Sequence, residues 1–202
     1  KLSNLLYNKI YNNTGLYNFL CEIILPRSKK KASKRDKVNI VVSLIRNLVT
    51  LPFVPIFSYS KGSSKADIIC KYYYFILENK SAEEIMEEFE SVINYIWKFN
   101  SVCKERNNYL YDSKLFYEVL YWAISIVLQN GEEIEDSKIE LVFDYISNAS
   151  ENHKLWDNII NNPQRSVEQI FESTGSHYYS AINNRYKFIA NIFQAIFKID
   201  YQ

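Results

Sequence analysis

The chain has 202 residues, of which 48% are hydrophobic and 23% are charged, and its formal net charge at pH 7 is +1. This balance excludes an intrinsically disordered chain, and it excludes attraction of a polyanion by the overall charge alone. The length suffices for one domain with a substantial core. Only four Gly and four Pro occur, which favours long helices over a fold of short strands and tight turns.

Helical periodicity predicts the elements of the N-terminal half, where apolar residues recur every three or four positions. The expected helices occupy residues 3–10, 16–25, 33–50 and 64–78. Ser3 is expected to cap the first helix, and either Ser33 or Asp36 the third, because these side chains accept hydrogen bonds from free N–H groups of a first turn. The cluster Asn12-Asn-Thr-Gly15 separates the first two helices, and segment 51–64 is the expected weak seam of the fold.

From residue 81 onward, Ser81-Ala-Glu-Glu84 predicts a capping box that opens a helix through Trp97, in which the hydroxyl and the carboxylate satisfy each other's backbone N–H groups. Residues 113–128 are apolar on almost every face and predict a buried central helix, which Asn130-Gly131 closes. Further helices are expected at residues 137–149, where a second Ser-x-x-Glu start occurs, and at 155–160, 166–173 and 178–199. We therefore predict one all-α domain over residues 1–202, with about eight helices.

The cysteines and the apolar segments bear on the compartment. Cys21, Cys70 and Cys103 stand singly in apolar helical contexts, which favours reduced, buried thiols in a cytoplasmic protein. No stretch of eighteen apolar residues occurs, so no membrane association is expected. The chain begins at Lys1 and its single methionine is Met86, from which we expect a piece of a longer protein.

Residues that could carry catalysis or bind a metal are few. The two histidines, His153 and His177, belong to no zinc-ligand spacing, and no serine or cysteine stands in a nucleophile motif. The carboxylates between Glu83 and Glu90 lie opposite an apolar stripe, and the first of them suit the positive end of a helix dipole. We therefore predict no catalytic residue, no metal and no cofactor in this chain. An enzyme with an unrecognised helical active site is the least supported alternative.

Two local patterns resemble known motifs and are interpreted structurally. Lys61-Gly-Ser-Ser-Lys65 lacks the upstream glycine and the Gly-Lys-Ser/Thr order of a phosphate-binding loop, so we interpret it as a turn and a cap. Ser166–Arg185 has the outline of a helix-turn-helix with Gly175 at its turn. Phe171, however, occupies a position where that motif needs a small residue, and basic residues on its second helix are few, chiefly Arg185 and Lys187.

The basic run Arg27-Ser-Lys-Lys-Lys-Ala-Ser-Lys-Arg-Asp-Lys37 is the strongest candidate for a binding site. Clustered Lys and Arg gain affinity for a polyanion by releasing its condensed counterions, although phosphate contacts read no base sequence. The alternative is a solvated loop that charge keeps soluble. The predicted nucleic-acid-binding residues are Arg27, Lys29, Lys30, Lys31, Lys34, Arg35 and Lys37.

Four segments, taken in order, resemble the helical C-terminal half of a bacterial family. The segments are Ser33–Ile40, Ser81–Phe89, Asp112–Leu120 and Ala181–Ile189. The family is the ParB-like domain of unknown function, DUF262 type, known for an N-terminal Asp-Gly-Gln-Gln-Arg motif that has no counterpart in these residues. The resemblance implies a parent protein of restriction or phage-defence systems with nucleotide-dependent DNA recognition or cleavage. It carries no catalytic residue over to this chain.

Two functions stay open at this point. The first is a helical, DNA-associated scaffold region of a DNA-targeting restriction or phage-defence protein, which is non-catalytic by itself. The second is a helical interaction or assembly module with no nucleic-acid role. In that case its aromatic surface, drawn from seventeen Tyr, twelve Phe and three Trp, meets an N-terminal domain or another subunit.

Overall fold

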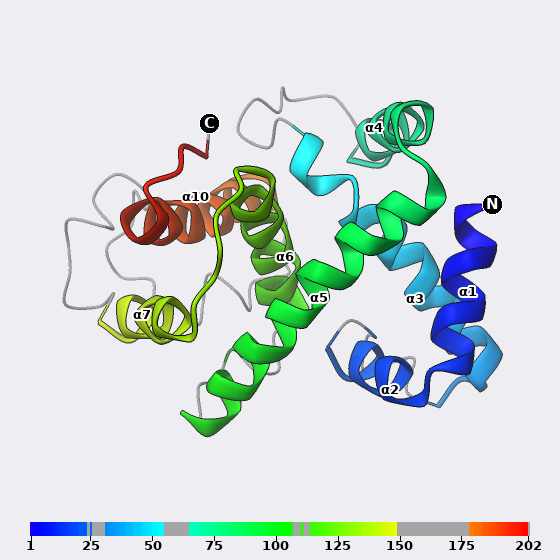
Figure 1. The fold of residues 1–202 in the computed structure, drawn as a ribbon, viewed down its shortest axis with the longest axis horizontal. Coiled ribbons are helices and arrows are strands. Elements are labelled where there is room, and N and C mark those ends of the chain that lie inside the picture. The colour runs from blue at the N-terminus through cyan, green and yellow to red at the C-terminus, as the bar shows by residue number, and fades with distance from the viewer. Residues whose placement is uncertain are drawn as a thin grey trace. The chain divides into compact units, whose positions relative to one another are not determined.

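The computed structural model describes residues 1–23, 25, 31–54, 65–106, 110, 114–148 and 178–201. In this part of the chain there are eight α-helices, one short 3-10 helix and no strand (Figure 1). The elements are α1 (Leu2–Asn12), α2 (Thr14–Ile23), α3 (Lys34–Leu48), η2 (Leu51–Phe53), α4 (Lys65–Asn79), α5 (Ala82–Glu105), α6 (Lys114–Gln129), α7 (Asp136–Ser147) and α10 (Tyr178–Phe197). The all-α prediction is confirmed. The helices expected at 155–160 and 166–173 lie outside the described residues.

The chain divides into two compact units, residues 1–91 and residues 92–202. Unit 1 holds α1 to α4 and the first turns of α5, and unit 2 holds the rest of α5 with α6, α7 and α10. The boundary falls inside α5, whereas most of the expected seam, residues 55–64, lies outside the described residues. The single-domain organisation stays a prediction, and each unit is described below by itself.

In unit 1, α1 packs against α2 and α3. Apolar residues four positions apart on α1, namely Leu2, Leu6 and Ile10, are buried, and so is the apolar face of α3. The buried residues of α3 are Val38, Val41, Val42, Ile45 and Leu48. This three- and four-residue spacing puts one stripe of each helix into the core and leaves the opposite face polar.

The helix starts of unit 1 agree only in part with the predicted caps. Ser33 is the N-cap of α3, since its hydroxyl oxygen accepts the backbone N–H of Asp36 at 3.2 Å. Ser3 is not a cap, because α1 begins at Leu2 directly after Lys1. The break between α1 and α2 is confined to Asn13, whose side-chain oxygen accepts the N–H of Leu16 at 3.0 Å and so starts α2 early.

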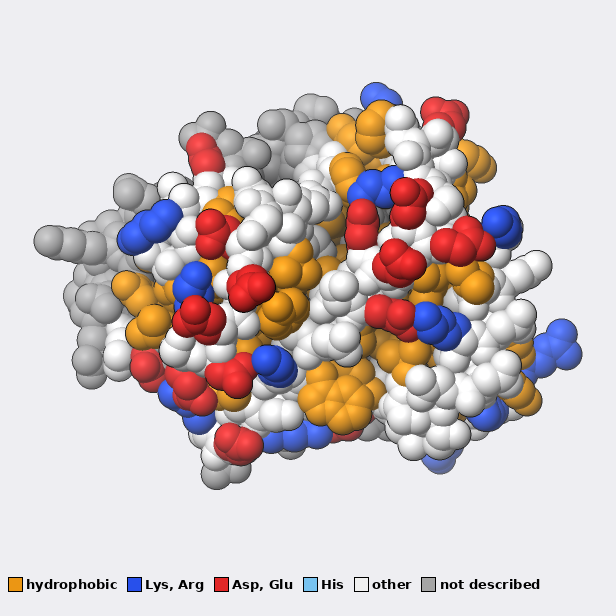
Figure 2. All heavy atoms as spheres, in the orientation of Figure 1, with side chains coloured by type: hydrophobic (Ala, Val, Ile, Leu, Met, Phe, Trp, Pro, Cys, Tyr) orange, Lys and Arg blue, Asp and Glu red, His pale blue; other side chains and the backbone are white. Residues whose placement is uncertain are grey.

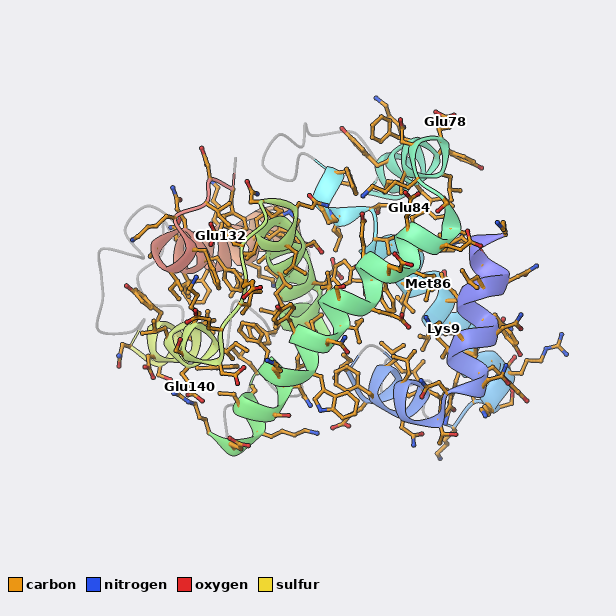
Figure 3. All side chains as sticks on the ribbon, viewed as in Figure 1. Lys9, Glu78, Glu84, Met86, Glu132 and Glu140 are labelled. Atoms are coloured by element: carbon orange, nitrogen blue, oxygen red, sulfur yellow. The ribbon has the colours of Figure 1, made fainter. Side chains whose placement is uncertain are left out.

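The capping box at the start of α5 is confirmed. The Ser81 hydroxyl oxygen accepts the N–H of Glu84 at 3.1 Å, and the Glu84 carboxylate accepts the N–H of Ser81 at 2.7 Å. These reciprocal bonds satisfy two backbone donors that the first turn cannot pair internally. Glu84 stands at this helix start in Figure 3.

The core of unit 2 forms around α6, which is the buried helix predicted at 113–128. Its buried residues include Phe116, Trp122, Ala123 and Ile124, and α10 packs against both α6 and α7. One phenylalanine from each of four helices meets in the core, Phe99 of α5, Phe116 of α6, Phe143 of α7 and Phe193 of α10. The ring centroids lie 6.0 Å apart for Phe99 and Phe143, 6.2 Å for Phe99 and Phe193 and 6.3 Å for Phe116 and Phe143. These separations fit favourable aromatic pairing.

The ends of the unit 2 helices show one confirmed prediction and one wrong one. Gly131, at φ +76°, ends α6 in a Schellman motif, with Glu132 N–H bonded to Val127 O and Gly131 N–H bonded to Leu128 O. The expected Ser137-x-x-Glu capping box is absent, because α7 begins at Asp136 with Glu135 as N-cap. The Glu140 side chain instead pairs with Arg106, the residue that follows α5, so a tertiary ion pair replaces the local cap.

Candidate nucleic-acid interface

The basic run is described from Lys31 onward, while Arg27, Lys29 and Lys30 lie outside the described residues. Lys31 lies two residues before Ser33, the N-cap of α3. Lys34, Arg35 and Lys37 are among the first four residues of that helix. Lys31, Lys34 and Arg35 are exposed, whereas Lys37 is half-buried. Because a helix N-terminus carries a positive partial charge, α3 adds to the cationic potential of these side chains.

Asp36 is the one acidic residue in the first turn of α3, and it serves the cap. Its carboxylate accepts the Ser33 hydroxyl at 2.6 Å while its own N–H donates to the same hydroxyl. This pair of bonds fixes where the helix starts, and therefore fixes the directions in which Lys34 and Arg35 leave it. Asp36 thus orders the cationic turn, but its carboxylate also adds one negative charge to it.

Aromatic rings of two neighbouring helices lie against this turn, which the sequence did not predict. The Lys34 ammonium is 4.4 Å from the centroid of the Tyr11 ring on α1 and 5.4 Å from that of Tyr17 on α2. Tyr7 stacks on Tyr11, with 5.5 Å between centroids and 13° between ring planes. We call Lys31, Lys34, Arg35, Tyr7, Tyr11 and Tyr17 the basic-aromatic surface. The basic run predicted the three cations, whereas the one sequence signal for the rings was the i, i+4 spacing of Tyr7 and Tyr11, which predicts a ring pair and not its cationic partner.

The half-buried side of this region contains a thiol. Burial raises the pKa of Cys21 above its ordinary value, and a hydrogen bond from Tyr17 and the charge of Lys37 oppose part of that rise. Burial also raises the pKa of Tyr17, with the Cys21 neighbour adding to it. The charge of the half-buried Lys37 therefore acts on the Cys21 thiol of α2. The exposed cations of the turn are Lys31, Lys34 and Arg35.

Charge is distributed unevenly between the two units. Residues 1–91 contain fourteen Lys and Arg against nine Asp and Glu, a net charge of +5. Residues 92–202 contain ten against fourteen, a net charge of −4, so the near-neutral total hides two opposite halves. On the face of unit 1 seen in Figure 2, carboxylates lie over the first turns of α5, and Lys and Arg project at the edge that α1 and α3 form.

Four carboxylates of α5 make contacts within the protein. Glu83 pairs with Lys1 at 3.2 Å, Glu90 pairs with Lys9 at 2.5 Å and Glu88 pairs with Lys80, while Glu84 completes the capping box. Lys9 lies on α1, as Figure 3 labels it. These pairs use the cations of unit 1 that lie near α5. None of these pairs involves the cations at the start of α3.

The other sequence candidates contribute little to a site. His153, His177 and residues 61–64 lie outside the described residues, as does the first part of the helix-turn-helix outline. Arg185, expected on its second helix, is only 2% exposed and so cannot reach a nucleic acid, whereas Lys187 is exposed. Within the described ranges no three His, Cys, Asp or Glu side chains gather as a metal site would require. In the same ranges, no helix has both the length and the apolar character to cross a bilayer.

Unit 1 also contains an open pocket of about 340 Å³ where the start of α1 faces α4 and the start of α5. Its two cations are Lys1 and Lys80, and each is already paired, with Glu83 and Glu88 respectively. An anionic ligand would have to compete with these carboxylates. The basic-aromatic surface is therefore the better candidate for binding a polyanion.

No family model matches this chain, and neither the curated proteins nor the solved structures contain a significant match to it. The resemblance of four helical segments to the ParB-like DUF262 family stays a prediction from the sequence.

Proposed function

We propose that unit 1 binds DNA through the basic-aromatic surface, as a non-catalytic scaffold region of a larger DNA-targeting protein. The observation that carries the proposal is the cluster of exposed cations Lys31, Lys34 and Arg35 at the positive end of α3. The net charge of +5 on residues 1–91 supports it, because a cationic unit attracts a polyanion even when the whole chain is nearly neutral. A role in restriction or phage defence rests on the family resemblance.

The surface suits phosphate contact more than base reading. Lys and Arg that neutralise phosphates release counterions, so affinity falls linearly on a plot of log K against log salt concentration. The slope is about −0.9 per phosphate contact for duplex DNA and about −0.7 for a single strand. Each cation of the basic-aromatic surface that touches a phosphate should therefore contribute close to one unit of slope.

Charge reversal tests the proposal. The variant Lys31→Glu/Arg35→Glu leaves the Ser33 cap and the Lys34–Tyr11 contact intact. We expect it to weaken binding of a labelled oligonucleotide in 50 mM salt by at least tenfold and to reduce the magnitude of the salt slope by about two units. Fluorescence anisotropy over 50–200 mM salt, on the full 202-residue chain, measures both quantities.

The matched control is Lys71→Glu/Lys187→Glu, which makes the same change of net charge at exposed positions on α4 and α10. If the proposal is correct, this control changes affinity and slope much less than Lys31→Glu/Arg35→Glu. Equal effects of the two double variants, or binding by the parent chain that does not depend on salt, contradict the proposal.

One observation favours the alternative of an interaction module. On α4, Tyr74 is 66% exposed and Phe75 is 51% exposed, in a chain where most large apolar side chains that the structure describes are buried. If this face binds another copy of the chain, light scattering after size exclusion will show a dimer, and Tyr74→Ser/Phe75→Ser will return it to a monomer. A monomeric parent chain argues against self-association through α4.

A further inference from the structure

We infer that the basic-aromatic surface binds single-stranded DNA in particular, with unpaired bases stacking on the tyrosine rings while the cations hold the phosphates. The inference rests on the DNA binding proposed above and adds the class of DNA. Its basis is the combination that sequence-tolerant single-strand sites use, which is a cationic groove or turn with aromatic rings set among the charges.

Two tyrosine rings lie next to Lys34, one of the cations that would hold the strand. Tyr7 and Tyr11 stand one helical turn apart on α1 with their planes 13° from parallel, and Tyr11 is 39% exposed. The Tyr17 ring of α2 is also near the Lys34 ammonium, with 5.4 Å between the ammonium and the ring centroid. Because α1, α2 and α3 pack against one another, rings and cations are held in one place before any ligand arrives.

Lys34 covers part of Tyr11 in the free protein, so a base must displace it. The contact between an exposed ammonium and a tyrosine is weak, whereas a base stacked on an aromatic side chain contributes several-fold more to affinity. The released ammonium stands next to the incoming strand and gains a phosphate partner in place of the ring. When DNA binds, Tyr11 therefore exchanges Lys34 for a base, and Lys34 exchanges the ring for a phosphate. Both exchanges favour binding.

Duplex DNA would have to contact unit 1 in a different way. In a duplex the base faces are covered by their neighbours, so the tyrosine rings gain nothing from them. The competing possibility is that α3 enters a major groove with its exposed polar face, made of Arg35, Asn39, Ser43 and Asn47. That face has one exposed cation at each end, Arg35 in the first turn and Arg46 in the last, where Arg46 lies 5.4 Å from the Tyr73 ring centroid of α4; the cluster of several cations with rings beside it is at the first turn alone. The observations therefore favour the single strand.

The test compares two labelled probes, a 20-nucleotide oligo-dT strand and a 20-base-pair duplex, in fluorescence anisotropy with the 202-residue chain. The variant Tyr11→Leu keeps an apolar side chain and removes the ring. We expect it to weaken binding of oligo-dT by about tenfold, to leave duplex affinity within about twofold, and to leave the salt slope unchanged because no cation is lost. Tyr74→Leu on α4 is the control, since it removes another exposed tyrosine of unit 1.

The outcomes separate this inference from the proposed function. If the cation reversals weaken binding but Tyr11→Leu behaves like Tyr74→Leu on oligo-dT, DNA binding stands and the stacking inference is overturned. Tighter binding of duplex than of oligo-dT also overturns it, and Asn39→Ala would then distinguish groove binding by α3. If neither probe binds in a salt-dependent way, the proposed function fails together with the inference. Thermal unfolding followed by circular dichroism checks that each variant is folded.

Discussion

The Lys34 ammonium lies 4.4 Å from the centroid of the Tyr11 ring, which holds the first residue of α3 against the last turn of α1. The contact connects two helices whose buried faces already pack together, and it brings a cation to the end of an aromatic pair. It is therefore both a small contribution to the stability of unit 1 and the centre of the proposed binding surface.

Removing the charge of Lys34 should destabilise the free protein slightly. We expect Lys34→Met to lower the free energy of unfolding by about 0.5–1 kcal/mol, the range for exposed contacts of this kind. In urea denaturation the loss should be much smaller when Tyr11 is already leucine, because the two side chains act through one contact. Lys31→Met, at an exposed position outside α3, is the control and should change stability by less than about 0.5 kcal/mol. Additive effects of Lys34→Met and Tyr11→Leu would show that the contact contributes nothing.

The capping box should matter for the stability of α5 and should depend on pH. Ser81→Ala is expected to cost about 1 kcal/mol at pH 7, the usual loss for a removed N-cap. Backbone and side-chain hydrogen bonds from Ser81 lower the pKa of Glu84, so the stabilisation by its carboxylate is present above the ordinary pKa of a glutamate and is lost as pH falls.

Urea denaturation at pH 7 and pH 3 therefore measures the pH dependence of this box. We expect the stability difference between the parent chain and Glu84→Gln to shrink at pH 3, below the ordinary pKa of 4.5 from which the Glu84 pKa is lowered. Glu87→Gln, on an exposed position of the same helix, is the matched control and should show little difference at either pH. A difference for Glu84→Gln that grows on acidification would contradict the assignment.

Two residues with positive φ should respond to substitution in opposite directions. Gly131 has φ +76°, and no atom lies within 4 Å of the point where a Cβ would stand, so Gly131→Ala suffers from backbone strain alone, about 1–2 kcal/mol. Lys198, after the end of α10, has φ +60°, a conformation that only glycine adopts without strain. Lys198→Gly should gain up to about 1 kcal/mol, less whatever its bond to Ala195 O contributes. Thermal unfolding measures both changes in stability. Changes of the same sign would contradict backbone strain at positive φ as their common cause.

Tyr201 should anchor the last residues to unit 2 through its hydroxyl. The buried hydroxyl donates to Ala123 O at 3.1 Å, and the ring packs on that of Trp122 with 5.2 Å between the ring centroids. We expect Tyr201→Phe to cost about 1 kcal/mol at pH 7. Burial raises the pKa of Tyr201, so its contribution is complete below the ordinary value of 10.0 and is lost as pH rises beyond it. The stabilities of parent and Tyr201→Phe should thus converge above pH 10, and parallel curves would contradict this.

The thiols of Cys21 and Cys103, neither of which is in a disulfide, should differ in reactivity. Cys103 is buried, and burial raises its pKa to about 12, whereas Cys21 is half-buried. Because the thiolate is the reactive species, iodoacetamide at pH 8 should modify Cys21 well before Cys103 in the folded chain. Peptide mass spectrometry over time measures the two rates, and a denatured sample should show them equalised. Faster modification of Cys103 in the folded chain would mean that its environment is open.

Local interactions made much of the fold predictable. The Ser33 cap, the Ser81–Glu84 box and the Gly131 helix end depend on residues within five positions of each other, and all three are present. The apolar surface of 113–128 likewise predicted the buried helix, since among the helices that the structure describes no other has apolar residues on so many faces. Where local signals compete, prediction failed. Ser3 and Ser137 have the residue type of a cap, but α1 and α7 begin before them.

By itself, the sequence determined the helical class, most helix starts and the cationic run, because each depends on spacing along one helix or on charge in one segment. Only the tertiary structure decided the partners of those charges. It brought Tyr11 and Tyr17 to Lys34, turned Glu140 from an expected cap to Arg106, and buried Arg185 inside unit 2. These contacts join residues far apart in the chain, and their geometry follows from how the apolar faces pack, which local periodicity does not specify.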